Sequence, residues 1–530
     1  MQPTRSLAEA GNRYRASGVW RDESIASRFV ESVARRPASI AVVDGDRRLT
    51  FAELGDATNR FAATLRDVGV GAGDVVSVQL PCWWQTIAIS HAVLVLGAVL
   101  NPILPSFRQR ELSFVINEAR PRAIVVPGRY RGVDHPALLG ELDLPEHALL
   151  TVRTGDTDEL VIAHAAPSPN LARSTAGPGH GDDVAALLYT SGTTSTPKGV
   201  LHTHNTLLAE AAGIVGTHEI TPDDVLMYTM PFGHIGGILY AILVPTLVGN
   251  RTVLMDSWDP TRAVELIEQE RVTVQPGMPV FLRGMLASAG FTQPRVASLR
   301  LFPMGGSTVT ARDVHDARES LGCASKRTYG STELPTLCTG SSSDTPEQLA
   351  MTEGRPIGAN EVRIVDADGN DVAPGRAGEI LGRGPELCAG YLDTRFNADA
   401  FTADGWFRTG DLGTVDATGH LVVVGRLKDI IIRGGENISP KLIEDVLLEH
   451  PSIAGVGVVG YPDPLYGERV CAVVATTDAA FGFTTMIDYL KDRGLAPYQL
   501  PEKLIVRAEL PYTLTGKLDK SALRAEAAAP

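Results

Sequence analysis

The stretch Leu187-Leu-Tyr-Thr-Ser-Gly-Thr-Thr-Ser-Thr-Pro-Lys-Gly-Val200 decides how this chain is interpreted. The apolar run from Val184 to Leu188 predicts a buried strand, which ends where small hydroxyl and glycine residues begin. The apolar pair Val200-Leu201 predicts a second strand soon after Lys198. Small residues let backbone N–H groups approach an anion, hydroxyl groups add donors, and a lysine adds positive charge. The stretch therefore predicts two strands joined by a loop that can hold a polyphosphate.

This loop differs from the Walker A loop of many nucleotide-binding proteins. Gly199 follows the lysine where that motif has Ser or Thr, Pro197 precedes it, and a strand rather than a helix is expected next. A loop rich in Ser, Thr and Gly is by itself typical of a flexible connection. Its interpretation as a phosphate site therefore depends on the other motifs of the chain.

Length and composition limit the class of protein. A chain of 530 residues is too long for one hydrophobic core, so at least two domains are expected. The net charge of −14 argues against a general nucleic-acid-binding protein, which would need clustered cations. The five cysteines are widely spaced without a CxxC pair, which favours reduced, buried thiols. The first residues lack the basic and apolar order of a signal peptide, so a cytoplasmic protein is expected.

The order of apolar segments predicts a mixed α/β fold. Residues 1–180 alternate helical and strand patterns, which indicates parallel sheets covered by helices. Ile87–Leu100 is strongly apolar but too short to span a membrane, and it predicts a buried helix. Short strands with glycine turns over Gly354–Val424 predict an antiparallel barrel or sheet. The remaining ~105 residues predict a compact α+β domain, in which a helix begins at Pro440 and turns Leu442 inward.

Three polar residues follow the loop. His202 and His204 have the spacing of a metal-binding pair, but no further ligands lie nearby in sequence. A solvated strand end is the favoured interpretation of the two histidines. Asn205 is expected to cap the next helix.

Of six further stretches, two contain residues whose chemistry suits a nucleotide. Tyr329 before a glycine offers a flat ring for a purine, and Glu333 supplies the hard oxygens that Mg²⁺ prefers. Asp411 lies at a glycine turn, where a carboxylate can accept both ribose hydroxyls or simply cap the turn. The stretches are Met230–Gly237, Gly305–Ser307, Thr328–Glu333, Phe407–Leu412, Gly425–Pro440 and Pro511–Leu518.

Together with the loop, these stretches resemble, in the same order, the motifs of the acyl-adenylate-forming enzymes. That superfamily includes acyl-CoA synthetases, peptide-synthetase adenylation domains and beetle luciferases. Ser195 stands where the family usually has Gly. The stretches Arg13–Trp20 and Pro105–Leu112 look most like bacterial ligases for alicyclic acids such as cyclohexanecarboxylate, with aryl-acid ligases as relatives.

The resemblance implies two domains and a role for each motif. The N-terminal domain would cover 1–424, with a β-rich subdomain at 354–424, and a mobile C-terminal domain would cover 425–530 and carry the catalytic lysine. His234 and Lys198 are implied as further catalytic residues beside Lys517, Glu333 and Thr190 for Mg²⁺, Lys428 for the hinge, and Gly434, Gly435 and Glu436 for the pantetheine arm of coenzyme A. Those implied in ATP and AMP binding are Thr190, Ser191, Gly192, Thr193, Thr194, Lys198, Gly305, Gly306, Ser307, Thr328, Tyr329, Gly330, Ser331, Thr332, Asp411, Arg426 and Lys517.

The implied acyl pocket contains no Lys, Arg or carboxylate. Its residues would be His234, Ile235, Gly236, Gly305, Gly330, Leu334 and Pro335. A second charge on the substrate would be buried there unpaired, at a cost of roughly several kcal/mol. The expected substrate is therefore an alicyclic, aryl or medium-chain acid that is uncharged apart from its carboxylate.

The resemblance implies that the acid attacks ATP to give acyl-AMP and pyrophosphate, and that a thiol then displaces AMP. Coenzyme A and the arm of a separate carrier protein stay open as acceptors, and the short sequence after Lys517 favours coenzyme A. A nucleotide-binding regulator without catalysis is a third interpretation. The implied partners are a small acid, ATP, Mg²⁺ and coenzyme A; no nucleic acid or membrane span is expected, and a homodimer stays open.

Overall fold

A seven-stranded sheet forms the centre of the N-terminal region in the computed structural model, which describes residues 1–5, 7–152, 160–164, 179–190, 197–512 and 518–529. Its central strands are parallel, as predicted, and one antiparallel strand closes each edge. In spatial order the strands are β11 (Gly199–Thr203), β10 (Val184–Tyr189), β4 (Val99–Pro102), β3 (Val75–Val78), β5 (Ala123–Pro127), β8 (Ala148–Val152) and β9 (Leu160–His164).

The apolar segment after β3 forms a deeply buried helix, α4 (Trp84–Val95), in which every residue from Trp84 to Leu94 is buried. The helix ends before the predicted Leu100, because Gly97 turns the chain with a φ of 67° and β4 then begins. The other helices of this region are α1 (Ala8–Ala16), α2 (Ile25–Arg35), α3 (Phe51–Asp67), α5 (Gln109–Ala119), α6 (His135–Gly140), α7 (His204–Thr217), the π-helix η1 (Gly237–Leu243) and α8 (Val244–Val248). Within the described ranges, no helix has the length and apolarity that a membrane crossing requires.

Two further rows of four hydrogen-bonded strands belong to the N-terminal region. Isolated bridges from Val274 to Leu226 and Leu301 join the two rows. The first row contains β12 (Val225–Tyr228), β13 (Arg251–Leu254), β1 (Ile40–Asp44) and β2 (Arg47–Thr50), and the second β14 (Leu301–Gly305), β15 (Ala324–Tyr329), β16 (Cys338–Thr339) and β17 (Arg355–Pro356). The helices near them are α9 (Pro260–Glu270), α10 (Pro279–Ala287), α11 (Ala311–Asp316), the π-helix η3 (Ala317–Leu321) and α12 (Pro346–Met351).

The β-rich segment after β17 forms an antiparallel four-stranded sheet rather than a closed barrel. Its order is β18 (Glu361–Val365), β19 (Gly378–Arg383), β20 (Phe407–Val415) and β21 (Leu421–Arg426), and α13 (Asn397–Ala400) lies between β19 and β20 in sequence. A core of apolar side chains from this sheet, including Ile380, packs with Leu334 and Leu337 from the loop after β15. The sheet is therefore tied to the main body through its core.

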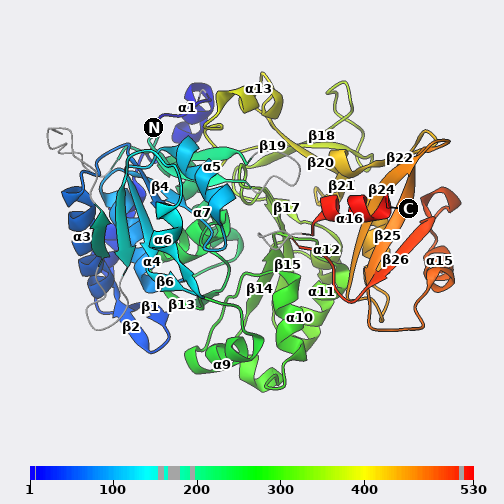
Figure 1. Cartoon of the computed structure of the whole chain (residues 1–530), viewed down its shortest axis with the longest axis horizontal. Coiled ribbons are helices and arrows are strands. Elements are labelled where there is room, and N and C mark those ends of the chain that lie inside the picture. The colour runs from blue at the N-terminus through cyan, green and yellow to red at the C-terminus, as the bar shows by residue number, and fades with distance from the viewer. Residues whose placement is uncertain (6, 153–159, 165–178, 191–196, 513–517, 530) are drawn as a thin grey trace.

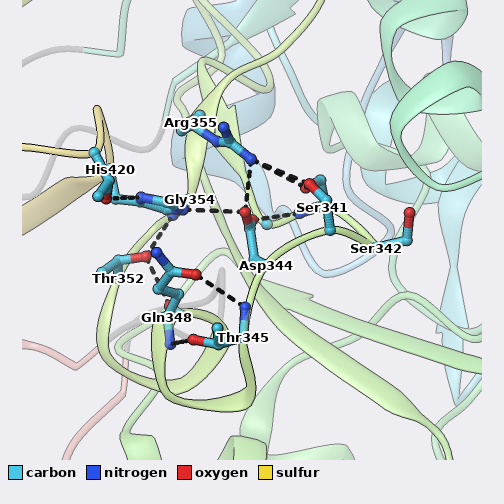
Figure 2. Close-up of polar contacts among 12 residues, drawn as sticks. Ser341, Ser342, Asp344, Thr345, Gln348, Thr352, Gly354, Arg355 and His420 are labelled. Carbon is cyan, nitrogen blue, oxygen red and sulfur yellow. Dashed lines mark hydrogen bonds and ion pairs between the residues drawn. The ribbon is translucent and has the colours of Figure 1, made fainter.

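A buried carboxylate ties the loop before α12 to the same sheet (Figure 2). Asp344 accepts from the backbone N–H of Ser341, lies 2.7 Å from the Arg355 guanidinium, and lies 3.1 Å from His420 Nε2. His420 directly precedes β21 in the sequence. Asp344 thus links the loop before α12 to β17 and to the turn between β20 and β21.

The C-terminal region forms a separate five-stranded sheet, drawn in orange and red at one end of the molecule, away from the blue and cyan seven-stranded sheet (Figure 1). Its strands are β22 (Ile431–Arg433), β23 (Glu436–Ile438), β24 (Gly455–Asp463), β25 (Gly467–Ala475) and β26 (Lys503–Arg507), with helices α14 (Pro440–Leu448), α15 (Phe483–Asp492) and α16 (Lys520–Ala527). Helix α14 begins at Pro440 as predicted. Leu442, however, is 42% exposed and does not face the core, which Ile443 and Leu447 fill.

The mixed α/β fold with a large N-terminal and a small C-terminal region confirms the predicted fold class. All five cysteines are buried and none forms a disulfide, which confirms the interpretation of their spacing. The division between residues 424 and 425 stays a prediction.

Candidate active site

The predicted phosphate loop joins two paired strands. Strands β10 and β11 are antiparallel, with Tyr189 opposite Gly199. The Thr190 N–H donates to the Lys198 carbonyl at 3.0 Å, and the Lys198 N–H lies 3.3 Å from the Thr190 hydroxyl. These two contacts close the base of the loop. Of the residues predicted to bind phosphate, Ser191, Gly192, Thr193 and Thr194 lie outside the described residues.

The Lys198 ammonium lies against two aromatic rings. Its Nζ is 4.7 Å from the ring centroid of Phe396 and 5.1 Å from that of Tyr391. Contacts of this kind attract a cation to the ring face. The rings hold the ammonium close to the base of the loop, and no carboxylate of the described residues forms an ion pair with it.

Three residues predicted to bind the nucleotide contact one another and come from β15, β20 and β21. Asp411, predicted at a glycine turn, lies instead in the middle of β20. The Tyr329 hydroxyl donates to Asp411 Oδ2 at 2.8 Å, and Arg426 Nε lies 3.1 Å from Asp411 Oδ1. Asp411 and Arg426 are directly opposite each other across the β20–β21 pair. Burial, and then the Asp411 charge, raise the pKa of the Tyr329 hydroxyl well above its usual value, so the hydroxyl remains a donor. A carboxylate has about four lone-pair positions, so Asp411 can accept further bonds from a ribose.

The Glu333 carboxylate lies in the segment that follows β15 and is mostly buried. Its Oε1 accepts a hydrogen bond of 2.6 Å from the Tyr391 hydroxyl, and no other described residue donates to the carboxylate. Burial and the Glu333 charge raise the pKa of Tyr391, which keeps the hydroxyl protonated. A carboxylate oxygen suits Mg²⁺, which binds proteins through one or two carboxylates. The residues present therefore fit a magnesium ion.

Glu333 is held by a tight turn. The Ser331 hydroxyl lies within 3.2 Å of the Glu333 N–H, and the Ser331 N–H donates to the Leu334 carbonyl. A Cβ at Gly330 would lie 2.0 Å from the Pro335 carbonyl oxygen, so only glycine fits this turn. His202 Nε2 lies 2.7 Å from the Thr332 carbonyl oxygen, and this contact helps to hold the turn in place.

The interpretation of His202 and His204 as a solvated strand end was wrong. Both side chains are buried, and burial lowers the pKa of each to about 4. His204 Nδ1 accepts from the Ile25 N–H at 3.2 Å. Other segments of the chain cover β11 and bury both histidines. The residue pattern of β11 itself does not show that it is covered.

Asn205 is not the helix cap that was predicted. Helix α7 begins at His204, and the Thr203 hydroxyl accepts from the Thr206 N–H as its cap. The Asn205 amide donates instead to Asp22 and Asp182 at 2.9 Å each. A cap two positions earlier satisfies the helix end, which leaves Asn205 for a contact between distant segments.

The residues predicted for the acyl pocket are spread over several environments. His234 lines a cavity together with apolar residues. Gly305 ends β14, where a Cβ would lie 2.8 Å from the Thr328 carbonyl oxygen, and Ile235 packs on the main core. Leu334 is 1% exposed and packs inside the β-rich core. The cavity is lined by Pro102, Ile103, Leu104, Phe107, Val115, Tyr189, Gly233 and His234.

Gly306 and Ser307, also predicted to contact the nucleotide, continue the chain past the end of β14. Gly306 has a φ of 77°, which favours glycine, and Ser307 is exposed. They lie one after the other at the edge where β14 and β15 pair, next to Thr328. The sheet therefore places this motif beside the Thr328–Glu333 motif.

The predicted hinge and pantetheine residues lie where the β-rich sheet meets the C-terminal sheet. Lys428 is in a short 3₁₀ turn, Leu427–Asp429, and burial lowers its pKa. Gly434 and Gly435 form the β22–β23 turn with φ of 59° and 92°, and Glu436 is exposed. The Gly434 N–H donates to the Tyr466 carbonyl at 2.8 Å. Lys517 lies outside the described residues.

Just after the turn, Thr336 contacts a buried carboxylate pair, Glu210 and Glu386, that sequence reasoning missed. The Thr336 hydroxyl donates to Glu210 at 2.5 Å, and the Thr336 N–H donates to Glu386 at 3.1 Å. Burial raises the pKa of both carboxyl groups, so the pair retains a proton.

Tyr391 and Phe396 were missed as well. In the sequence Tyr391 follows Gly390 and Phe396 comes five positions later, a pattern that is common in cores.

Two family models and several known proteins match this chain. Residues 29–392 match the AMP-binding enzyme family, and residues 442–517 match the AMP-binding enzyme C-terminal domain. Over 96% of its length the chain is 33% identical to a medium-chain fatty-acid–CoA ligase of Escherichia coli, of which it covers 92%. It is 36% identical to a salicylyl-CoA synthase / salicylate adenylyltransferase of a Streptomyces species, over 97% of this chain and 96% of the relative.

A solved structure gives the same result for the fold. ATP-bound MatB from Rhodopseudomonas palustris superposes with a TM-score of 0.85 at 27% identity, over 95% of this chain and 99% of that one. The nucleotide motifs thus lie within a shared fold that extends over nearly the whole chain. From the two family matches and this shared fold we conclude that the chain belongs to the AMP-binding enzyme family.

Proposed function

We propose that the protein is an ATP-dependent acid–thiol ligase that converts a carboxylic acid into its coenzyme A thioester through an acyl-AMP intermediate. The observation that carries the proposal is the meeting of Tyr329, Asp411 and Arg426, where a nucleoside would find its partners. The names of the two relatives, both of which activate acids, support it.

In the first step, a carboxylate oxygen of the acid attacks the α-phosphorus of ATP. The bond from that phosphorus to the bridging oxygen breaks, and pyrophosphate leaves with the bond electrons. Phosphoryl transfer needs mainly positioning and charge neutralisation. Lys198 and the loop from Thr190 would hold the departing pyrophosphate, and Lys517 would bridge the acid and the α-phosphate.

Glu333 and Thr190 would hold a magnesium ion, which neutralises phosphate charge when bound. In the second step, the sulfur of coenzyme A attacks the acyl carbon, the thiol proton leaves to solvent, and AMP departs. The small domain at 425–530 would turn about Lys428 between the two steps and bring Gly434, Gly435 and Glu436 toward the pantetheine arm.

The proposed acid is alicyclic, aryl or medium-chain, with no second charge. The predicted pocket residues support this choice, because none is a carboxylate, Lys or Arg, and the small cavity that His234 lines has no charged side chain among its other lining residues. A charged tail would lose its hydration there without gaining a partner.

The alternative is an adenylating enzyme that loads a separate carrier protein. The name of the Streptomyces relative also includes an adenylyltransferase, which supports this alternative. In both cases the acid is first activated as acyl-AMP, so the two proposals differ only in the acceptor thiol.

ATP–pyrophosphate exchange with a panel of alicyclic, aryl, short-chain and medium-chain acids tests the proposal. The same panel with coenzyme A then tests for thioester. Exchange followed by thioester is the expected result. Exchange without thioester would move the acceptor to a carrier protein, and no exchange with any acid of the panel would contradict the ligase.

A further inference from the structure

The segment around Tyr391 is paired with the strand that follows the phosphate loop. Tyr391 lies opposite Val200 in an antiparallel bridge, and the Leu392 N–H donates to the Gly199 carbonyl at 2.7 Å. The Leu201 N–H donates to the Gly390 carbonyl at 2.9 Å. Tyr391 therefore has a fixed register just beyond Lys198, although it lies far from it in sequence.

The N-terminal residues hold the same segment from the other side. The N–H groups of Thr4 and Arg5 both lie 3.0 Å from the Ala389 carbonyl oxygen, and the Thr4 hydroxyl donates to the Tyr391 carbonyl at 2.7 Å. Gly390 has a φ of 103°, and a Cβ there would lie 2.4 Å from the Thr4 hydroxyl. The backbone at Tyr391 is thus clamped between two distant parts of the chain.

This clamped backbone directs one side chain to two groups of the site. The Tyr391 hydroxyl donates to Glu333 Oε1 at 2.6 Å, while the face of its ring lies 5.1 Å from Lys198 Nζ. The ring itself is buried, with 2% of the residue exposed, and packs against Phe396 and Phe401. Its backbone and ring contacts therefore hold the Tyr391 side chain between Glu333 and Lys198.

We propose that Tyr391 is a positioning residue, whose hydroxyl orients the Glu333 carboxylate for a divalent cation and whose ring holds Lys198 for the phosphates. The proposal rests on the proposed function through the role of Glu333. A donor that engages one carboxylate oxygen fixes the orientation of the other, and loss of such an outer partner typically weakens metal binding by about 10–100-fold. The two contacts are separable, because the hydroxyl serves Glu333 and the ring serves Lys198.

The test measures Mn²⁺ binding to the full chain in the presence of a non-hydrolysable ATP analogue, with free Mn²⁺ followed by electron paramagnetic resonance. Tyr391→Phe keeps the ring and removes the hydroxyl. We expect its Kd for Mn²⁺ to rise about 10-fold or more, and its affinity for the analogue without metal to stay within about twofold, since the Lys198 contact is retained. Tyr130→Phe is the matched control, because its hydroxyl also faces a carboxylate, Asp256 at 3.4 Å, outside the site.

A double-mutant cycle with Glu333→Gln separates positioning from general damage. In the Glu333→Gln background, Tyr391→Phe should change the Kd for Mn²⁺ by less than about twofold, because the carboxylate that it orients is gone. A Tyr391→Phe Kd within about twofold of the wild-type value, or an undiminished effect in the Glu333→Gln background, would overturn the proposal.

The outcomes also separate this proposal from the ligase itself. If Glu333→Gln weakens Mn²⁺ binding and Tyr391→Phe does not, only the positioning role fails. If wild-type protein shows no pyrophosphate exchange with any acid, yet both variants weaken Mn²⁺ binding and the cycle is non-additive, the ligase fails and the positioning role stands. A Kd for Mn²⁺ that neither variant changes would overturn the metal role of Glu333 together with that of Tyr391.

Discussion

Asp411 receives the Tyr329 hydroxyl on one carboxylate oxygen and the Arg426 guanidinium on the other. The three side chains come from β15, β20 and β21, so two sheets meet at a single carboxylate. A carboxylate that is fixed in this way can present its remaining lone pairs in a defined direction.

Asp411→Asn should therefore weaken ATP binding. Hydrogen bonds to a charged group contribute about 1.5–3 kcal/mol, so we expect the Kd for ATP to rise about 10-fold or more. Isothermal titration calorimetry would measure the Kd directly. Tyr329→Phe, which keeps the ring and both carboxylate oxygens, should have a smaller effect. Equal ATP affinity for Asp411→Asn and the wild type would rule out a ribose contact.

Lys517→Ala should impair adenylation far more than thioester formation. Removing one well-placed charge commonly costs ~100-fold or more in rate, about 2.7 kcal/mol in the barrier. Pyrophosphate exchange measures the first half-reaction, and thioester release from supplied acyl-AMP measures the second. An equal loss in both half-reactions would contradict the assignment of the lysine to adenylation.

Lys428→Pro should spare adenylation and block the thiol step, if the Leu427–Asp429 turn is the hinge. Proline fixes φ near −65° and would prevent the rotation between the two arrangements. Lys428→Ala removes the same side chain but keeps backbone freedom, and it should retain both steps. Full turnover by Lys428→Pro would remove the hinge from this position.

Buried histidines should make the fold sensitive to mild acid. Burial lowers the pKa of His91 to about 3 and those of His202 and His204 to about 4. As the pH falls from about 6.5, the unfolded chain binds protons that the folded chain does not, so the free energy of unfolding decreases. Each histidine contributes up to about 1.4 kcal/mol per pH unit down to its folded pKa.

Urea unfolding at several pH values between 7.5 and 4.5 would measure this dependence. His91 is the best variant, because its Nδ1 is buried without a partner among the described residues and its ring stacks on Phe29 at 3.8 Å. His91→Leu should reduce the slope of stability against pH by about one proton. An unchanged slope would show that His91 is protonated in the folded state.

The sequence predicted those parts of the site that are local in the chain. The β10–β11 hairpin around the loop and the turn that begins with Tyr329 each lie within one short stretch, whose residue types reveal the chemistry. The glycine turn predicted at Asp411 was wrong, because Asp411 lies within β20 and pairs with Arg426. The buried helix α4 was also recognisable, because its apolar run is continuous. Its end was not, because a single glycine with positive φ decides it.

The contacts between distant stretches could not be predicted. Tyr391 reaches Glu333 only because residues 389–392 pair with β11, and such a register leaves no periodic mark in either segment. The burial of His202 depends in the same way on the segments packed around β11. Hydrophobic periodicity shows which face of an element is covered, but not which other element covers it.

The clamp on Ala389 and Tyr391 also has a consequence for biosynthesis. The hydroxyl of Thr4 finds its partner on Tyr391 only after 387 further positions of the chain have been made. When a ribosome has synthesised the phosphate loop and β11, it has not yet made Tyr391 and Phe396, whose rings contact Lys198. Prematurely terminated chains that stop before Tyr391 should carry the loop sequence but lack the clamp that orders its surroundings.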